Sequence, residues 1–167
     1  MDATERIKGK RILIVDDEKD VLDTLVDFLS ICKIDTALSF NEARELLENN
    51  DYDVAILDIM GVNGFELLEI AKERKIPALM LTAHGLSEEN LKKSAEEGAA
   101  YYAPKEKMHE IDLFVSDVIE AGMKKKSAWE RVFDRLGNFY DKKFGGTDWR
   151  EKEKDFWDKK LKQMSGL

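Results

Sequence analysis

Strand and helix signals alternate five times along the first three quarters of the chain. Most strand signals are short, nearly uninterrupted apolar runs, the second being weaker. The helix signals place apolar residues at three- and four-residue spacing. The predicted strands span residues 11–15, 34–40, 54–57, 77–82 and 99–103. Because uninterrupted apolar strands are buried on both faces, this order indicates a parallel sheet with helices on both sides. The predicted fold class is α/β, a five-stranded parallel doubly wound sheet.

Polar residues that can cap helices support the positions of two of the intervening helices. Asn41 stands before the helix that follows the second strand, and Ser87 before the helix that follows the fourth. Gly61 and Gly64 mark a loop after the third strand. The last helix of the set is predicted over residues 111–123.

Polar and charged side chains come at or just after the ends of four strands. Asp16 and Asp17 follow the first strand, Asp58 follows the third, Thr82 ends the fourth, and Lys105 comes shortly after the fifth. Ligands of open parallel sheets bind beyond the carboxyl ends of the strands, where the strand order reverses. We therefore expect these five side chains to lie close together.

Such a group of side chains fits chemistry on a phosphoryl group. Clustered carboxylates repel, since two unit charges about 4 Å apart cost roughly 4 kcal/mol at an effective dielectric near 20. A divalent cation removes that cost, and Mg²⁺ prefers hard oxygen ligands. A carboxylate beside such a cation can act as a nucleophile and form an aspartyl phosphate. Lys105 and Thr82 would offer a positive charge and a hydroxyl to the phosphoryl oxygens.

In this order, the residues resemble the receiver domain of response regulators, the CheY-like family of two-component signalling. The likeness covers about residues 10–123 and rests on motifs at four strand ends. The motifs are Ile14-Val15-Asp16-Asp17-Glu18, Val54-Ala55-Ile56-Leu57-Asp58, Met80-Leu81-Thr82-Ala83 and Tyr102-Ala103-Pro104-Lys105.

The resemblance implies a role for each residue of the acidic group. Asp58 would accept a phosphoryl group from a sensor histidine kinase or a phosphotransfer protein. Asp16, Asp17, Asp58 and the backbone carbonyl of Met60 would hold Mg²⁺. Lys105 would act as the lysine that the family places near the phosphoacceptor.

The resemblance also implies a switch. Thr82 would contact the phosphoryl group, and Tyr102 would move in response, so that a protein-interaction surface changes shape for an unknown downstream protein. Such a chain is a signalling protein, not an enzyme acting on a separate substrate, and catalyses only its own phosphorylation and dephosphorylation.

Two departures from the family pattern keep alternatives open. The loop from Asp58 to Gly64 is shorter than the family's common form and has no proline, and Glu106 follows the lysine where the family often has proline. One alternative is a pseudo-receiver that binds partners without phosphorylation. A less favoured one is a phosphatase with an aspartyl intermediate, which usually carries a second Asp two residues on, where this chain has Met60.

Charge and composition exclude several other classes of protein. The net charge of −8 and pI of about 5.0 argue against binding to nucleic acid or to anionic membranes. The sequence has no apolar run near the roughly 20 residues that a membrane helix needs. A single cysteine, Cys32, and a polar amino terminus without a signal peptide predict a cytoplasmic protein.

The composition changes near residue 127. Eight of the 15 aromatic residues, including all three tryptophans, lie in residues 128–167. We therefore predict an N-terminal lead (1–9), a receiver domain (10–126) and a helical C-terminal extension (127–167). The extension is too short and too nearly charge-balanced for a typical DNA-binding output domain.

Aromatic residues at helical spacing predict two helices in the extension. The first covers about residues 129–140, Gly145 and Gly146 end it, and Asp148 is predicted to cap the second. These helices either fold back on the receiver or pack against another chain. We favour association, including a homodimer through these helices, because a receiver is normally complete without a tail and large apolar patches are rarely left exposed.

Overall fold

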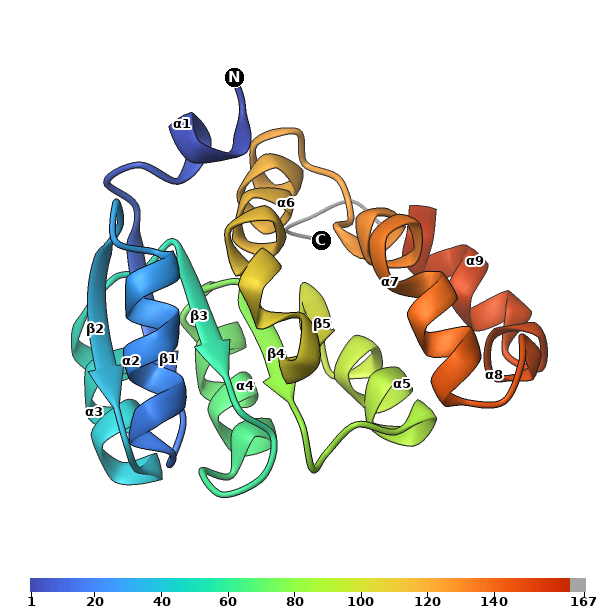
Figure 1. The fold of residues 1–167 in the computed structure, drawn as a ribbon, viewed down its shortest axis with the longest axis horizontal. Coiled ribbons are helices and arrows are strands. Elements are labelled where there is room, and N and C mark those ends of the chain that lie inside the picture. Colours follow the sequence, from blue (N-terminus) through green and yellow to red (C-terminus); the bar gives the residue numbers. More distant parts are fainter. Residues whose placement is uncertain (163–167) are drawn as a thin grey trace.

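Five parallel strands form one sheet in the order β2-β1-β3-β4-β5 (Figure 1). The strands are β1 (Arg11–Val15), β2 (Lys33–Ala37), β3 (Val54–Leu57), β4 (Ala78–Thr82) and β5 (Tyr101–Pro104). This computed structural model describes residues 1–162, so the last five residues of the predicted extension, 163–167, lie outside the described residues. The sheet confirms the predicted fold class, and its strand order reverses between β1 and β3.

Helices cover both faces of the sheet, as expected for a sheet whose inner strands are largely apolar. One face carries α2 (Lys19–Phe28) and α6 (Ile111–Met123), and the other carries α3 (Phe40–Asn49), α4 (Gly64–Glu73) and α5 (Glu88–Glu96) (Figure 1). A 3-10 helix, η1 (Lys105–Glu110), joins β5 to α6. Every residue of β3 and β4 is buried between these two layers. Among residues 1–162, no helix combines the length and the apolar character needed to cross a bilayer.

The predicted N-terminal lead contains a short helix, α1 (Ala3–Ile7), which packs on α6. Asp2 caps it by accepting a hydrogen bond from the backbone N–H of Glu5 at 2.8 Å. Arg6 reaches α6, donating to Ser116 Oγ at 2.7 Å and lying 2.9 Å from Glu120. The lead is therefore tied to the last helix of the receiver.

Several predicted boundaries are confirmed and others are wrong by a few residues. The predictions for β1, β3 and α6 match the structure, and Ser87 caps α5 by accepting from the Asn90 N–H at 3.0 Å. The predicted cap at Asn41 is wrong, because Ser39 caps α3 and Asn41 lies inside the helix. Because α3 already begins at Phe40, β2 ends at Ala37, three residues earlier than predicted. The fifth strand begins at Tyr101, two residues later than predicted.

The extension forms α7 (Trp129–Lys143), α8 (Asp148–Glu151) and α9 (Lys154–Lys162), which lie beside β5 and α5 (Figure 1). The predicted first helix is confirmed, as is its end before Gly145 and Gly146, whose φ angles are +80° and +133°. The prediction for Asp148 is wrong: it is the first residue of α8, and two helices follow the glycines instead of one.

The extension packs on the receiver of its own chain, which removes the argument from which we predicted association. Trp129, Trp149 and Trp157 are each only 2% exposed. β5 is the last strand of the sheet, so its outer carbonyls need partners. The Tyr140 hydroxyl donates to the Tyr102 carbonyl on β5 at 2.7 Å, and just before the strand Trp129 Nε1 donates to the Ala99 carbonyl at 2.9 Å. The predicted homodimer thereby loses the exposed aromatic surface from which it was argued.

Candidate functional site

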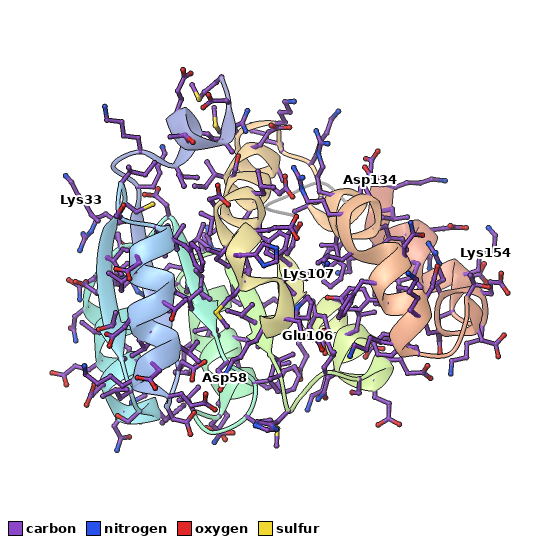
Figure 2. The ribbon with its side chains drawn as sticks, in the orientation of Figure 1. Lys33, Asp58, Glu106, Lys107, Asp134 and Lys154 are labelled. Carbon is purple, nitrogen blue, oxygen red and sulfur yellow. The ribbon has the colours of Figure 1, made fainter. Side chains whose placement is uncertain are left out.

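Three carboxylates meet where the strand order reverses. Asp16 and Asp17 follow β1 and Asp58 follows β3, the next strand in the sheet. Each offers one oxygen, and these three oxygens lie within 4.8 Å of one another. Asp16 and Asp58 are buried, whereas Asp17 is exposed (Figure 2 labels Asp58). The parallel pairing of β1 with β3 thus brings together the acidic group that the sequence predicted.

Lys105, the first residue of η1, supplies a positive charge beside these carboxylates. Its Nζ lies 2.7 Å from Asp16 Oδ2 and 3.6 Å from Asp58 Oδ2, and only 8% of its side chain is exposed. Burial opposes the ammonium charge, but the contacts with Asp16 and Asp58 outweigh it and raise the pKa of Lys105. The group of three carboxylates therefore has one lysine beside it, in contact with two of them.

The excess of negative over positive charge in this group affects the pKa of Asp58. Burial, together with the neighbouring charge of Asp16, raises the pKa of Asp58 to about 7, against the opposing effect of Lys105. The raised pKa means that Lys105 does not fully compensate the negative charge of the Asp58 carboxylate. A bound cation would supply the missing compensation.

This pKa gives a prediction for the metal-free protein. Because the pKa of Asp58 in the fold lies above its ordinary value of 3.8, the protonated form stabilises the fold, and this stability is lost as the pH rises through about 7. In excess chelator, we expect Asp58→Asn to raise the melting temperature at pH 8 and to raise it less at pH 5. Thermal unfolding followed by circular dichroism measures the difference. A gain of equal size at both pH values would contradict the raised pKa.

Thr82 lies at the end of β4, fully buried. Its Oγ1 accepts a hydrogen bond from the Gly85 N–H at 2.9 Å. A Cβ on Gly85 would lie only 2.7 Å from that oxygen, so the close approach requires glycine. Thr82 is thereby tied to the loop between β4 and α5.

The two adjacent tyrosines of β5 have different partners. The Tyr102 hydroxyl donates to the Gly85 carbonyl at 3.0 Å and accepts from the Ser87 N–H at 3.2 Å. The Tyr101 hydroxyl donates to Asp117 on α6 at 2.8 Å. Both rings are fully buried. Of the two tyrosines, Tyr102 is the one that hydrogen-bonds to the loop between β4 and α5, to which Thr82 is also bonded.

The shortened loop after Asp58 closes tightly. A Cβ on Gly64, where α4 begins, would lie 2.1 Å from the Asp58 carbonyl oxygen, so only glycine allows this approach. Asn63 adopts a left-handed conformation with φ of 57°. Met60 lies between these points, in the loop that follows Asp58, and its side chain is 51% exposed.

Sequence reasoning missed two residues that hold this arrangement. Gly85 links Thr82 to Tyr102, and Asn90 Nδ2 donates to the Gly85 carbonyl at 2.8 Å. A glycine three residues beyond a strand end was the signal available for Gly85. Asn90 lies in the first turn of α5, and nothing in the sequence indicated that its amide would contact the loop.

Comparisons of the sequence with known proteins point to one family. The family profile of the response regulator receiver domain matches residues 12–117. The transcriptional regulatory protein TcrA of Mycobacterium tuberculosis is 35% identical over 89 residues, which cover 50% of this chain and 35% of that protein. The regulatory protein VanRB of Enterococcus faecalis is 32% identical over 132 residues, covering 76% of this chain and 58% of that protein. The chain thus spans about a third to somewhat over half of these relatives.

Solved receiver structures resemble the same part of the chain. A Francisella response regulator receiver domain is 25% identical with a TM-score of 0.60, covering 67% of this chain and 98% of that one. A CheY-like receiver domain protein from Methanospirillum hungatei is 28% identical with a TM-score of 0.57, covering 68% and 98%. With the matched profile spanning most of the sheet and its strand-end residues, the chain belongs to the response-regulator receiver family.

Proposed function

We propose that Asp58 is the phosphoacceptor of this receiver, and that a sensor histidine kinase or a phosphotransfer protein supplies the phosphoryl group. The observation that carries the proposal is the placement of a buried Asp58 among two further carboxylates and Lys105. A carboxylate oxygen of Asp58 would bond to phosphorus as the bond from phosphorus to the donor breaks. Lys105 would then face both Asp58 and the added negative charge.

Thr82 has a part in the same proposal. Its hydroxyl oxygen accepts from Gly85, which leaves the hydroxyl proton available to donate to a phosphoryl oxygen. The chain would catalyse its own phosphorylation and dephosphorylation and act on no separate substrate. The signalling protein would operate in the cytoplasm, with the receiver in residues 10–126 and the extension in residues 127–167.

The acidic group fits Mg²⁺, which we propose as the cofactor. Three oxygen ligands within 4.8 Å, one of them on an exposed residue, match a hard cation that keeps several waters. Asp16, Asp17, Asp58 and the Met60 carbonyl would hold the ion, which when bound supplies positive charge against the phosphoryl oxygens.

Incubation of the full chain with acetyl phosphate and Mg²⁺ tests this function. We expect intact-mass analysis to show one added phosphoryl group on Asp58, and excess chelator to suppress it, because three carboxylates otherwise repel the donor. Labelling that is complete in chelator would contradict the metal site. A chain that remains unlabelled in Mg²⁺ would contradict the proposal and favour a pseudo-receiver that works through binding alone.

A further inference from the structure

Contacts between the extension and the receiver include one on β5, one on η1 and one at the start of α5. On β5, the Tyr140 hydroxyl donates to the Tyr102 carbonyl at 2.7 Å, and the two rings lie 5.8 Å apart between centroids. On η1, Lys143 lies 2.9 Å from Glu106, which Figure 2 labels. At the start of α5, Lys152 lies 2.5 Å from Glu88. Together with a contact on α6, these contacts span the face made by α5, β5 and α6 (residues 88–96, 101–104 and 111–123), the α5–β5–α6 face.

A partly buried ion pair fixes α7 at the α6 side of this face. Arg135 donates to both carboxylate oxygens of Asp117, at 2.6 and 3.1 Å. Asp117 is 6% exposed and also accepts from Tyr101. Bidentate pairs of this kind fix orientation as well as position. α7 is thus held in one orientation across β5.

A series of hydrogen bonds joins Thr82 to this helix. The Gly85 N–H donates to Thr82 at 2.9 Å, the Tyr102 hydroxyl donates to the Gly85 carbonyl at 3.0 Å, and the Tyr140 hydroxyl donates to the Tyr102 carbonyl at 2.7 Å. Each member is buried. The end of β4 and the extension are therefore connected through the loop after β4 and through Tyr102.

We propose that residues 128–162 are a built-in occupant of the α5–β5–α6 face, and that phosphorylation of Asp58 weakens their docking. The proposal rests on the proposed function of Asp58. A phosphoryl oxygen that draws the Thr82 hydroxyl toward Asp58 takes it away from the Gly85 N–H. The Gly85 carbonyl then shifts relative to the Tyr102 hydroxyl, and the ring on which Tyr140 packs moves. Such a shift removes the extension's central contact and frees the face for another protein.

Thermodynamic reciprocity makes the coupling measurable from the other side. If occupation of the Asp58 site weakens docking by a given factor, complete release of the extension must strengthen occupation of that site by the same factor. Beryllium fluoride suits this test because it binds reversibly, and a receiver of this fold is described as BeF3-activated. A variant in the extension should then change the affinity of a site that it does not touch.

The tryptophans report docking without added labels. All three lie in the extension, and each is 2% exposed. We expect beryllium fluoride with Mg²⁺ to shift the tryptophan emission of the full chain to longer wavelength as water reaches the indoles. Thr82→Ala at saturating beryllium fluoride should leave the emission unshifted, because the link from the site to Gly85 is cut.

Tyr140→Phe is the decisive variant. It keeps the ring but leaves the Tyr102 carbonyl without its donor while the extension is docked, so it favours release. We expect it to bind beryllium fluoride at least about fivefold more tightly than wild type, by ¹⁹F NMR. Tyr52→Phe is the matched control, since it removes a 2.7 Å hydrogen bond to Asp35 on β2, far from the extension. Its affinity should equal that of wild type.

The outcomes separate this proposal from the proposed function. Binding of beryllium fluoride with unchanged emission, and equal affinity in Tyr140→Phe and wild type, would overturn the coupling and leave Asp58 as the phosphoacceptor. A chain that neither binds beryllium fluoride nor accepts a phosphoryl group from acetyl phosphate would overturn both.

Discussion

Asp58→Asn should abolish labelling of the chain by acetyl phosphate while the fold remains intact. The amide matches the carboxylate in shape but is a poor nucleophile toward phosphorus, so no stable acyl phosphate forms. The substitution also removes a buried charge whose pKa is raised by burial and by Asp16, so it does not threaten the fold. Intact-mass analysis should show no added phosphoryl group under conditions that label wild type fully.

Asp53→Asn is the matched control for this variant. Asp53 precedes β3 and Asp58 follows it, so the same substitution is made at the opposite end of one strand. The Asp53 carboxylate accepts from the Arg11 N–H at 2.8 Å and lies away from the acidic group. Asp53→Asn should label as wild type does. If Asp58→Asn labels at the wild-type rate, Asp58 is not the acceptor.

Trp129→Ala should lower the free energy of unfolding by about 3–5 kcal/mol, the usual cost of removing a large buried aromatic side chain. The Trp129 indole is 2% exposed, donates to the Ala99 carbonyl at 2.9 Å and lies 5.5 Å from the Trp157 ring. The substitution leaves a cavity and an unpaired carbonyl. Urea unfolding followed by far-ultraviolet circular dichroism measures the loss.

Phe28→Ala provides the comparison for Trp129→Ala. Phe28 is 43% exposed at the end of α2, so its truncation removes little buried surface and should cost far less. If the two variants lose similar stability, the extension contributes little to the folded receiver and docks as a separate unit.

The strands and the acidic group could be predicted because both follow from one pattern. β3, and β1 after Arg11, are uninterrupted apolar runs ended by acids, so the same pattern predicts the ends of both strands and the positions of Asp16 and Asp58. Parallel neighbours end at the same side of a sheet, so the sequence alone predicted that the carboxylates lie near one another. The N-cap of α3 was harder to predict, because Ser39 and Asn41 stand two residues apart and either residue type can cap a helix.

The packing of the extension could not be predicted from its own sequence. Helical spacing showed that Trp129 and Tyr140 share a buried face, but the same pattern fits burial on the receiver or on a second chain. Their partners are backbone carbonyls of Ala99 and Tyr102, and a carbonyl carries no residue-specific signal. The Asp117–Arg135 pair joins oppositely charged residues from two helices, each of which reads as an ordinary surface charge when its helix is considered alone.

The strand order also has a consequence for how the chain is made. After β1, the strands β3, β4 and β5 join the sheet successively on one side, so a nascent chain can build the sheet outward as it emerges. The helix that covers β5 ends at Lys143, 39 residues after Pro104. At about 5–20 residues per second, synthesis leaves the last strand uncovered for several seconds. During that interval the outer edge of β5 lacks the hydrogen-bond donor that α7 later provides.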